Sequence, residues 1–222
     1  MMNRFPDPSA LDVSVVYVAI GDAARAQVEQ SIVALRRLNC APLPVMIYSN
    51  DHLNVWTAST LVVPERLYTG YGGRRVKLAL DYLAQSQYAL YLDADTRPRS
   101  DPLPLYAPLL EGFDVVIAPS ANQGVRAFQH VDADERTTTL DDLGYTPVQW
   151  QAGVFAFART DAVQRFFAAW REAYEAGPAT EDQAAFVRAL HRSPLKMWVL
   201  SEALVDRTIL HLFGALRPKG KA

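Results

Sequence analysis

The 222-residue chain has few of the features that mark a specialised class of protein. Cys40 is its only cysteine, which excludes a disulfide within the chain and a zinc site built on cysteines. Its 22 basic and 24 acidic side chains give a net charge of -2, and no run of like charges occurs. Binding to nucleic acid requires a basic excess, so we expect no nucleic-acid partner.

Long hydrophobic runs are missing as well. The first apolar run, Val13–Ile20, has the length of a strand, whereas a helix that spans a membrane needs about 20 apolar residues. Residues 1–11 carry neither the apolar core nor the cleavage site of a signal peptide, so we interpret them as a short tail. With no targeting segment and a lone cysteine, the sequence predicts a cytoplasmic protein without a membrane span.

Strand-like and helix-like segments alternate in the first half of the chain. Val13–Ile20 is a continuous apolar run, typical of a strand buried on both faces. Asp22 then offers a helix N-cap, and one helix face follows through Ala24, Val28, Ile32, Leu35 and Leu38. Further strands are predicted at Val45–Tyr48, Leu61–Val63 and Tyr88–Leu92, with a helix at Val76–Leu83. This order predicts an α/β protein whose mostly parallel sheet is flanked by helices, in a single domain over residues 12–219.

The second half is less regular. Strands are predicted at Phe113–Ala118 and Gly153–Phe157, and apolar runs at Met197–Leu200 and Thr208–Phe213. One helix should bury its aromatic stripe, and a second begins near Glu181; the stripe is Val163, Phe166, Phe167, Trp170 and Tyr174. Between them, Pro119–Trp150 has no clear periodicity and is interpreted as an irregular segment of about thirty residues, a length that is often functional. Trp150 either stacks on a ligand or fills the core.

Polar residues follow three of the predicted strands, in the segments 20–22, 49–51 and 93–95. Ligands of parallel sheets bind outside the carboxyl ends of the strands. Asp93 and Asp95 are alternate residues at a strand end, so their carboxylates can converge. Two such carboxylates repel each other unless a proton or a cation lies between them, and a hard divalent cation prefers oxygen ligands. The other interpretation is a solvated turn.

The tetrapeptide Asp93-Ala94-Asp95-Thr96 also permits a different enzyme class. It fits the nucleophile motif of haloacid dehalogenase-like phosphohydrolases, in which the first aspartate attacks phosphorus and the second moves a proton. That motif normally follows the first strand of its domain. Here at least one complete strand–helix–strand unit precedes it, which argues against the phosphohydrolase.

Several segments, taken in order, resemble one family. Tyr91–Thr96 matches the hallmark Tyr-Leu-Asp-Ala-Asp-Thr of the GT-A glycosyltransferases, and most closely of glycosyltransferase family 8, the glycogenin and lipopolysaccharide galactosyltransferase-like enzymes. The other matching segments are Val15–Gly21, Ser31–Leu38, Arg75 with Lys77, Gln151-Ala152-Gly153, Glu181-Asp182-Gln183, His211 to Gly214 and Pro218-Lys219. Two of them depart from the family pattern: Gln151-Ala152-Gly153 replaces Asn-Ser-Gly, and Pro218-Lys219 inverts Lys-Pro, with Arg217 as an alternative cation.

The resemblance implies a GT-A fold and the transfer of a sugar from a nucleotide donor, with UDP as the expected nucleotide and the anomeric configuration retained. It implies that Asp93, Asp95 and His211 hold Mn²⁺ (or Mg²⁺) and that Asp182 and Gln183 serve the chemistry at the sugar. The implied nucleotide-sugar-binding residues are Ala19, Ile20, Gly21, Asn50, Arg75, Lys77, Asp93, Ala94, Asp95, Gln151, Gly153, Gly214 and Lys219. The acceptor is left open as a sugar, a glycan, a protein or a small molecule.

Each of these roles has a plain structural alternative. His211 lies in an apolar run and can be a core histidine. Asp182 can be an acid that stabilises the start of a helix, Lys77 and Arg75 can be solvated, and Lys219 can belong to a frayed terminus. The departure at Gln151-Ala152-Gly153 adds a third hypothesis to the glycosyltransferase and the phosphohydrolase: a nucleotide-sugar-binding domain without turnover.

Overall fold

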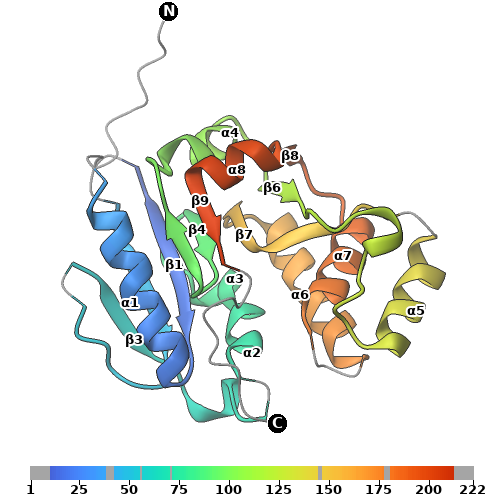
Figure 1. Cartoon of the computed structure of the whole chain (residues 1–222), viewed down its shortest axis with the longest axis horizontal. Helices are drawn as coiled ribbons and strands as arrows, with labels where there is room; N and C mark the ends of the chain where they lie inside the picture. The colour runs from blue at the N-terminus through green and yellow to red at the C-terminus, as the bar shows by residue number, and fades with distance from the viewer. Residues whose placement is uncertain are drawn as a thin grey trace, which may run out of the picture.

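A computed structural model of the chain describes residues 11–38, 43–55, 57–70, 72–144, 147–177 and 181–212. A seven-stranded sheet has the strand order β3-β2-β1-β4-β7-β6-β8, and a two-stranded sheet pairs β5 with β9 (Figure 1). The strands are β1 Val13–Ala19, β2 Val45–Ser49, β3 Ser59–Val62, β4 Tyr88–Leu92, β5 Thr96–Pro98, β6 Val115–Pro119, β7 Trp150–Ala158, β8 Met197–Val199 and β9 Ile209–His211.

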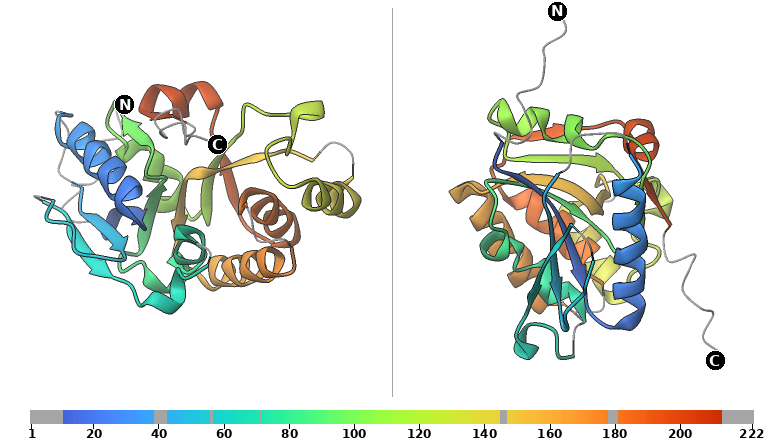
Figure 2. Two further views of the ribbon diagram at one scale, coloured as in Figure 1. Left: turned by 60° about the horizontal axis from the view of Figure 1, so that its bottom comes forward. Right: turned by 90° about the vertical axis from the view of Figure 1, so that its left-hand side faces the viewer.

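The helices cover both faces of the large sheet. They are α1 Asp22–Arg36, α2 Gly73–Lys77, α3 Leu80–Leu83, α4 Ala107–Leu110, α5 Ala133–Leu143, α6 Asp161–Glu175, α7 Gln183–Arg192 and α8 Glu202–Thr208, with short 3₁₀ turns at Glu65–Leu67, Leu103–Tyr106 and Gly124–Arg126. In the right-hand view of Figure 2, α1 lies on one side of the strands and α6 and α7 lie on the other. The predicted α/β class is therefore confirmed.

The sheet is mostly parallel, as predicted. β1 pairs in parallel with β2 and β4, β2 with β3, and β6 with β8, while β7 runs antiparallel to both β4 and β6. The parallel pairs bring the carboxyl ends of β1, β2 and β4 to one edge of the sheet. The antiparallel β7 brings its first residues, around Gly153, to that same edge.

Two hydrophobic clusters fill the space on either side of the sheet. β1 is buried along its whole length, and its side chains alternate between the two clusters: Val16 and Val18 face one, Val15 and Tyr17 the other. The first cluster packs against α6 and α7 and includes the aromatic stripe of α6, which is buried as predicted. The second packs against α1, α4 and α8. Full burial of β1 explains why its sequence is a continuous apolar run.

Three local predictions are wrong. Helix α1 starts at Asp22 itself, with Gly21 at the cap position at a φ of 86°, and the Asp22 carboxylate pairs with Arg25 instead of capping. The helix predicted at Val76–Leu83 is divided into α2 and α3. The break at Leu78 and Ala79 is stabilised from α6, because Arg171 donates a hydrogen bond to the carbonyl of Leu78 at 2.7 Å.

The third error concerns Pro119–Trp150, which contains the eleven-residue helix α5. Its buried residues are Glu135 and Thr139, so the buried face of α5 is polar and shows no hydrophobic period. Arg188 of α7 supplies the counter-charge, 3.2 Å from the Glu135 carboxylate, and also donates to the Thr139 hydroxyl and to the Ala173 carbonyl. A buried ion pair therefore takes the place of an apolar stripe.

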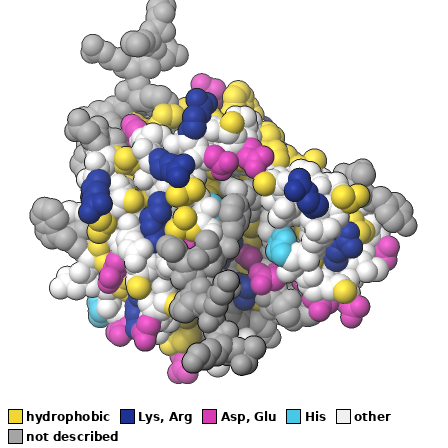
Figure 3. All heavy atoms as spheres, in the orientation of Figure 1, with side chains coloured by type: hydrophobic (Ala, Val, Ile, Leu, Met, Phe, Trp, Pro, Cys, Tyr) yellow, Lys and Arg dark blue, Asp and Glu magenta, His cyan; other side chains and the backbone are white. Residues whose placement is uncertain are grey.

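The surface carries charges of both signs. Figure 3 shows basic and acidic side chains interspersed over the visible face. Within the described ranges, the chain has no helix that is both long enough and apolar enough to pass through a bilayer.

Candidate active site

The ends of β1 and β2 are joined by hydrogen bonds at the predicted edge of the sheet. The Asn50 side chain accepts from the Gly21 amide at 2.8 Å and from Arg25 at 3.1 Å. Ser49 donates to the carbonyl of Ala19 at 2.8 Å. Ala19 is buried, and Ile20, Gly21 and Asn50 are half-buried. These predicted nucleotide-binding residues therefore lie together at one strand end, with Asn50 holding the start of α1.

Asp93 and Asp95 lie on a tight turn between β4 and β5. The Asp93 amide continues the sheet by donating to the Gly153 carbonyl at 2.8 Å. The Asp93 carbonyl then accepts from Thr96 twice, from the amide at 3.1 Å and from the hydroxyl at 2.7 Å. This turn leaves both carboxylates half-buried at the sheet edge.

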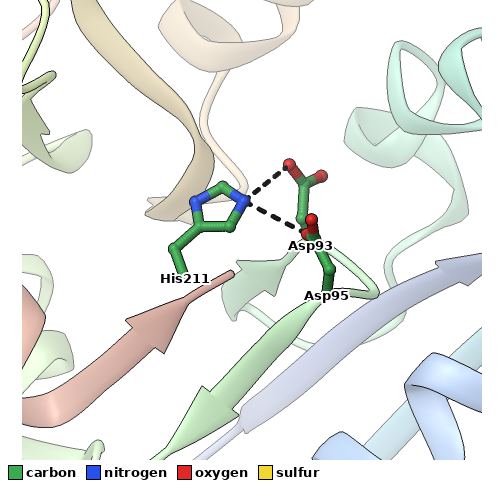
Figure 4. A group of neighbouring side chains, drawn as sticks. All are labelled: Asp93, Asp95 and His211. Atoms are coloured by element: carbon green, nitrogen blue, oxygen red, sulfur yellow. Dashed lines mark ion pairs between the residues drawn. The ribbon is translucent and has the colours of Figure 1, made fainter. Parts of the chain in front are cut away.

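His211 reaches this turn through the small second sheet. Thr96 of β5 is the register partner of His211 in β9, and the Leu212 amide donates to the Asp95 carbonyl at 3.0 Å. The His211 Nε2 atom lies 3.2 Å from Asp95 Oδ1 and 3.7 Å from Asp93 Oδ2 (Figure 4). One ligand atom from each of the three residues lies within 4.8 Å of the others. The pairing of β9 with β5 thus brings His211 next to Asp95, although the two residues are far apart in the sequence.

The three side chains fit a divalent cation in donor chemistry and in space. Two carboxylates and an imidazole are ligands that Mn²⁺ or Mg²⁺ accept. Gly153 faces the group: a Cβ built on it would overlap both Asp93 Oδ2 and His211 Cε1. Only a glycine at this position therefore allows the Asp93 and His211 side chains to lie this close to β7.

Asp93 is oriented from behind by two groups. The Tyr91 hydroxyl donates to Asp93 Oδ1 at 2.6 Å, and Lys77 Nζ lies 3.6 Å from the same oxygen. Burial raises the pKa of Tyr91 well above its ordinary value, and the Asp93 carboxylate raises it further, so the phenol keeps its proton. Both contacts are made to Oδ1, which leaves Oδ2 toward His211. The role of Tyr91 was not predicted, although its spacing of two from Asp93 places both on the same side of the strand.

Lys77 connects Asp93 to Asp182. Its Nζ atom is 2.7 Å from Asp182 Oδ2 and lies over the Tyr91 ring, 4.9 Å from the ring centre. Burial alone would lower the pKa of Lys77, but the carboxylates of Asp182 and Asp93 outweigh it, so the pKa is raised and the ammonium stays charged. Lys77 is therefore buried and paired, which contradicts the solvated helix face given as its alternative.

Arg75, the other predicted cation of α2, pairs with a residue of α6. Its guanidinium lies 3.3 Å from Glu175 of α6. The neighbouring Arg74 pairs with Glu181 at 2.9 Å. Two ion pairs therefore tie α2 to the C-terminal half of the chain.

Asp182 is the N-cap residue of α7, and Gln183 is its first residue. The Asp182 side chain makes no capping hydrogen bond, because it pairs with Lys77. The Gln183 amide nitrogen donates to the Trp150 carbonyl at 2.8 Å, so its oxygen faces His130 Nε2 at 2.9 Å and accepts from it. His130 was not predicted, because nothing in its local sequence distinguishes it.

The remaining predicted residues divide into two groups. Gln151 is buried on β7, and its Oε1 atom has no hydrogen-bond partner within the described ranges. Trp150 is half-buried and packs against the first hydrophobic cluster. Gly214 and Lys219, like the alternative cation Arg217, lie outside the described residues.

An acidic pair, a histidine and a buried lysine thus meet at one edge of the sheet. The model of the nucleotide-diphospho-sugar transferase family matches residues 57–217. The chain belongs to this family and is a glycosyltransferase. This assignment overturns the alternative of a haloacid dehalogenase-like phosphohydrolase. No curated protein matches the sequence significantly.

Solved structures show the same GT-A fold. The galactosyltransferase LgtC in complex with donor and acceptor sugar analogues has a TM-score of 0.57 at 16% identity, over 84% of this chain and 72% of that one. An active-site mutant of LgtC has a TM-score of 0.59 at 14% identity with the same coverage. Mouse xyloside xylosyltransferase 1 has a TM-score of 0.55 at 12% identity, over 85% of this chain and 84% of that one. The predicted resemblance to glycosyltransferase family 8 is confirmed at the level of the fold.

Proposed function

We propose that residues 12–219 form a metal-dependent glycosyltransferase domain that takes its sugar from a UDP-sugar and retains the anomeric configuration. The observation that carries this proposal is the meeting of Asp93, Asp95 and His211 beside Gly153, whose missing side chain permits their close approach. Donor and metal class follow the family resemblance, and the acceptor is a sugar or another hydroxyl compound, in keeping with the acceptor sugar analogue bound by LgtC.

In this proposal Asp93, Asp95 and His211 hold Mn²⁺ or Mg²⁺. A bound cation would offset the negative charge that builds on the nucleoside diphosphate as it departs. Tyr91 and Lys77 keep Asp93 Oδ2 turned toward His211 by holding Oδ1. The C-terminal Gly214 and Lys219 are proposed to contact the phosphates, where a lysine would neutralise charge.

The nucleoside is proposed to lie along the ends of β1 and β2, against Ala19, Ile20, Gly21 and Asn50. The sugar is proposed to lie between β7 and the start of α7. Gln151 supports this placement, because its buried Oε1 has no hydrogen-bond donor among the described residues and a sugar hydroxyl would supply one. Asp182 supports it too, since a carboxylate near the anomeric centre stabilises positive charge that develops there. Gln183 is held by two hydrogen bonds, which gives its amide one orientation.

The test is calorimetric titration of UDP in the presence and absence of Mn²⁺. We expect the wild type to bind UDP more tightly with the metal. Asp95→Ala removes one of three ligands, so the metal-dependent gain should fall by at least about tenfold, the scale on which even outer-shell changes act. Asp141→Ala is the matched control, because Asp141 is an exposed carboxylate on α5. Equal UDP affinity in wild type and Asp95→Ala, with and without Mn²⁺, would contradict the metal site.

Turnover is measured separately, either as hydrolysis of UDP-glucose and UDP-galactose to UDP and free sugar or as transfer of the sugar to a simple sugar acceptor with release of UDP. Release with the initial anomeric configuration, read by proton NMR before mutarotation, supports a retaining transferase. Metal-dependent UDP binding with no sugar release would instead indicate a binding domain without turnover, the alternative raised by the Gln151-Ala152-Gly153 departure.

A further inference from the structure

A single guanidinium holds the turn that presents Asp95. Arg97 lies on β5, two residues after Asp95. Its Nη1 atom donates to the carbonyls of Thr96 at 2.6 Å, Ala94 at 3.3 Å and Gln27 at 3.3 Å. Its Nη2 atom donates to the side-chain oxygens of Gln27 and Gln30, both at 2.6 Å. One side chain thus makes five hydrogen bonds to two separate segments of the chain.

Two of these acceptors flank Asp95 directly. The Ala94 and Thr96 carbonyls stand on either side of it, while its own carbonyl accepts from the Leu212 amide and that of Asp93 accepts from Thr96. All four carbonyls of residues 93–96 are therefore hydrogen-bonded. With every carbonyl of the turn engaged, the backbone sets the direction in which the Asp95 side chain leaves it.

The other acceptors attach the turn to α1. Gln27 and Gln30 are three residues apart, so they lie next to each other on one helix face. On the same helix, the Ser31 hydroxyl lies 3.4 Å from the Thr96 hydroxyl. The N-terminal end of α1 is held by Asn50 through Gly21. Arg97 consequently connects the helix that starts at the proposed nucleoside end to the turn that carries Asp95.

We propose that Arg97 is a positioning residue for the cation site: it fixes Asp95 relative to Asp93 and His211 by bracing the turn against α1. The inference rests on the proposed function, because it assigns a role to a residue through the metal that Asp95 would hold. Arg97 acts on the site through the backbone, since it donates to the carbonyls of Ala94 and Thr96 on either side of Asp95. Its planar, five-donor fork is what the role requires, and a lysine ammonium cannot span these acceptors.

The test compares Arg97→Lys with Arg36→Lys. Both changes keep the positive charge, so a difference reports geometry. Arg36 is the matched control because it too anchors α1, by donating to Thr57 and to the Leu43 carbonyl, away from the acidic turn. The Mn²⁺-dependent gain in UDP affinity should fall about ten- to a hundredfold in Arg97→Lys. It should be unchanged in Arg36→Lys, and metal-free UDP affinity should be equal in all three proteins.

Thermal unfolding without metal shows whether Arg97→Lys is folded. If it is not, the double variant Gln27→Ala, Gln30→Ala decides, since it leaves Arg97 in place and removes the Nη2 acceptors on α1. A reduced metal-dependent gain in this variant supports the inference, and a wild-type gain overturns it.

The outcomes separate the two proposals. A metal-dependent gain that is equal in wild type and folded Arg97→Lys overturns the role of Arg97 and leaves the proposed function standing. An equal loss in Arg97→Lys and Arg36→Lys also overturns it, because the effect would then be general to α1. No metal-dependent gain in the wild type removes the proposed function, and the inference with it.

Discussion

Gly153 stands where β7 comes closest to the acidic turn. Its carbonyl accepts from the Asp93 amide, and its missing side chain leaves room for Asp93 and His211 to approach each other. The conformation at this position is available to any residue, so the requirement for glycine is one of space. Tyr91 and Gly153 thus both contact Asp93, and both contacts favour one orientation of its carboxylate.

Gly153→Ala should reduce the Mn²⁺-dependent gain in UDP affinity, because the added methyl group pushes Asp93 and His211 apart. Overpacking of this kind costs about 1–3 kcal/mol of stability. Calorimetry with and without Mn²⁺ measures the first effect, and urea unfolding the second. Gly177→Ala is the control, since a Cβ there meets Glu135 Oε1 at 3.5 Å, an ordinary contact. A wild-type metal response in Gly153→Ala would show that the space is not needed.

At the scale of elements, helix α5 is attached to α7 by a buried ion pair. Its buried face is Glu135 and Thr139, and both contact Arg188 of α7. Burial raises the pKa of Glu135, although the Arg188 guanidinium acts in the opposite direction. The packing of α5 against α7 therefore depends on the Arg188–Glu135 ion pair, in which both charged groups are removed from water. Asp182 is the N-cap residue of α7 and Gln183 is its first residue, so α5 supports the helix that carries the proposed sugar contacts.

Arg188→Met should destabilise the protein by about 3–5 kcal/mol, because it leaves the Glu135 carboxylate buried without its counter-charge. The double change Arg188→Met, Glu135→Leu should recover most of this loss, since an apolar pair of similar size avoids the cost of burying charge. Urea unfolding of the four proteins in this cycle gives the coupling energy. Equal destabilisation in the single and double variants would show that packing volume, not charge, holds α5.

At the scale of the whole molecule, Lys77 joins the two halves of the chain. It lies at the end of α2, over the Tyr91 ring of β4, and it pairs with Asp182 at the N-cap of α7. The ion pairs of Arg74 with Glu181 and of Arg75 with Glu175 run in the same direction. These three ion pairs connect α2 to the C-terminal helices next to the proposed active site.

Lys77→Met should lower the free energy of unfolding by about 3–5 kcal/mol at neutral pH, because two carboxylates lose a buried partner. The raised pKa of Lys77 fixes the pH window. Its stabilisation is complete below the ordinary lysine pKa of about 10.4 and is lost as the pH rises through the higher folded-state pKa. Urea unfolding of both proteins at pH 7 and in the alkaline range tests this; a difference that grows with pH would contradict it.

Much of the architecture follows from the sequence alone. β1 was predicted as a buried strand because its apolar run is continuous, and the stripe of α6 because its aromatic residues share one helix face. The strand ends that carry Asn50 and Asp93 could be placed at one edge because parallel strands share a direction. These signals are local in the sequence, so no tertiary contact was needed to read them.

Other features exist only in the folded chain. The break between α2 and α3 is stabilised by Arg171 from α6, and α5 is paired with Arg188 of α7, so neither feature could be predicted from its own residues. Lys77 gains its partner from a helix in the far half of the chain. His211 could be assigned only by resemblance, because the pairing of β9 with β5 is what brings it to Asp95.

The sequence by itself determined the α/β class, the buried strands and the acidic pair at a strand end, since hydrophobic pattern and residue chemistry act within a segment. The tertiary structure alone decided which charges meet. Arg97 reaches back to α1, Tyr91 and Lys77 hold one oxygen of Asp93, and Gly153 leaves room for the other. Such contacts depend on distances between segments far apart in the chain, and chain folding sets those distances.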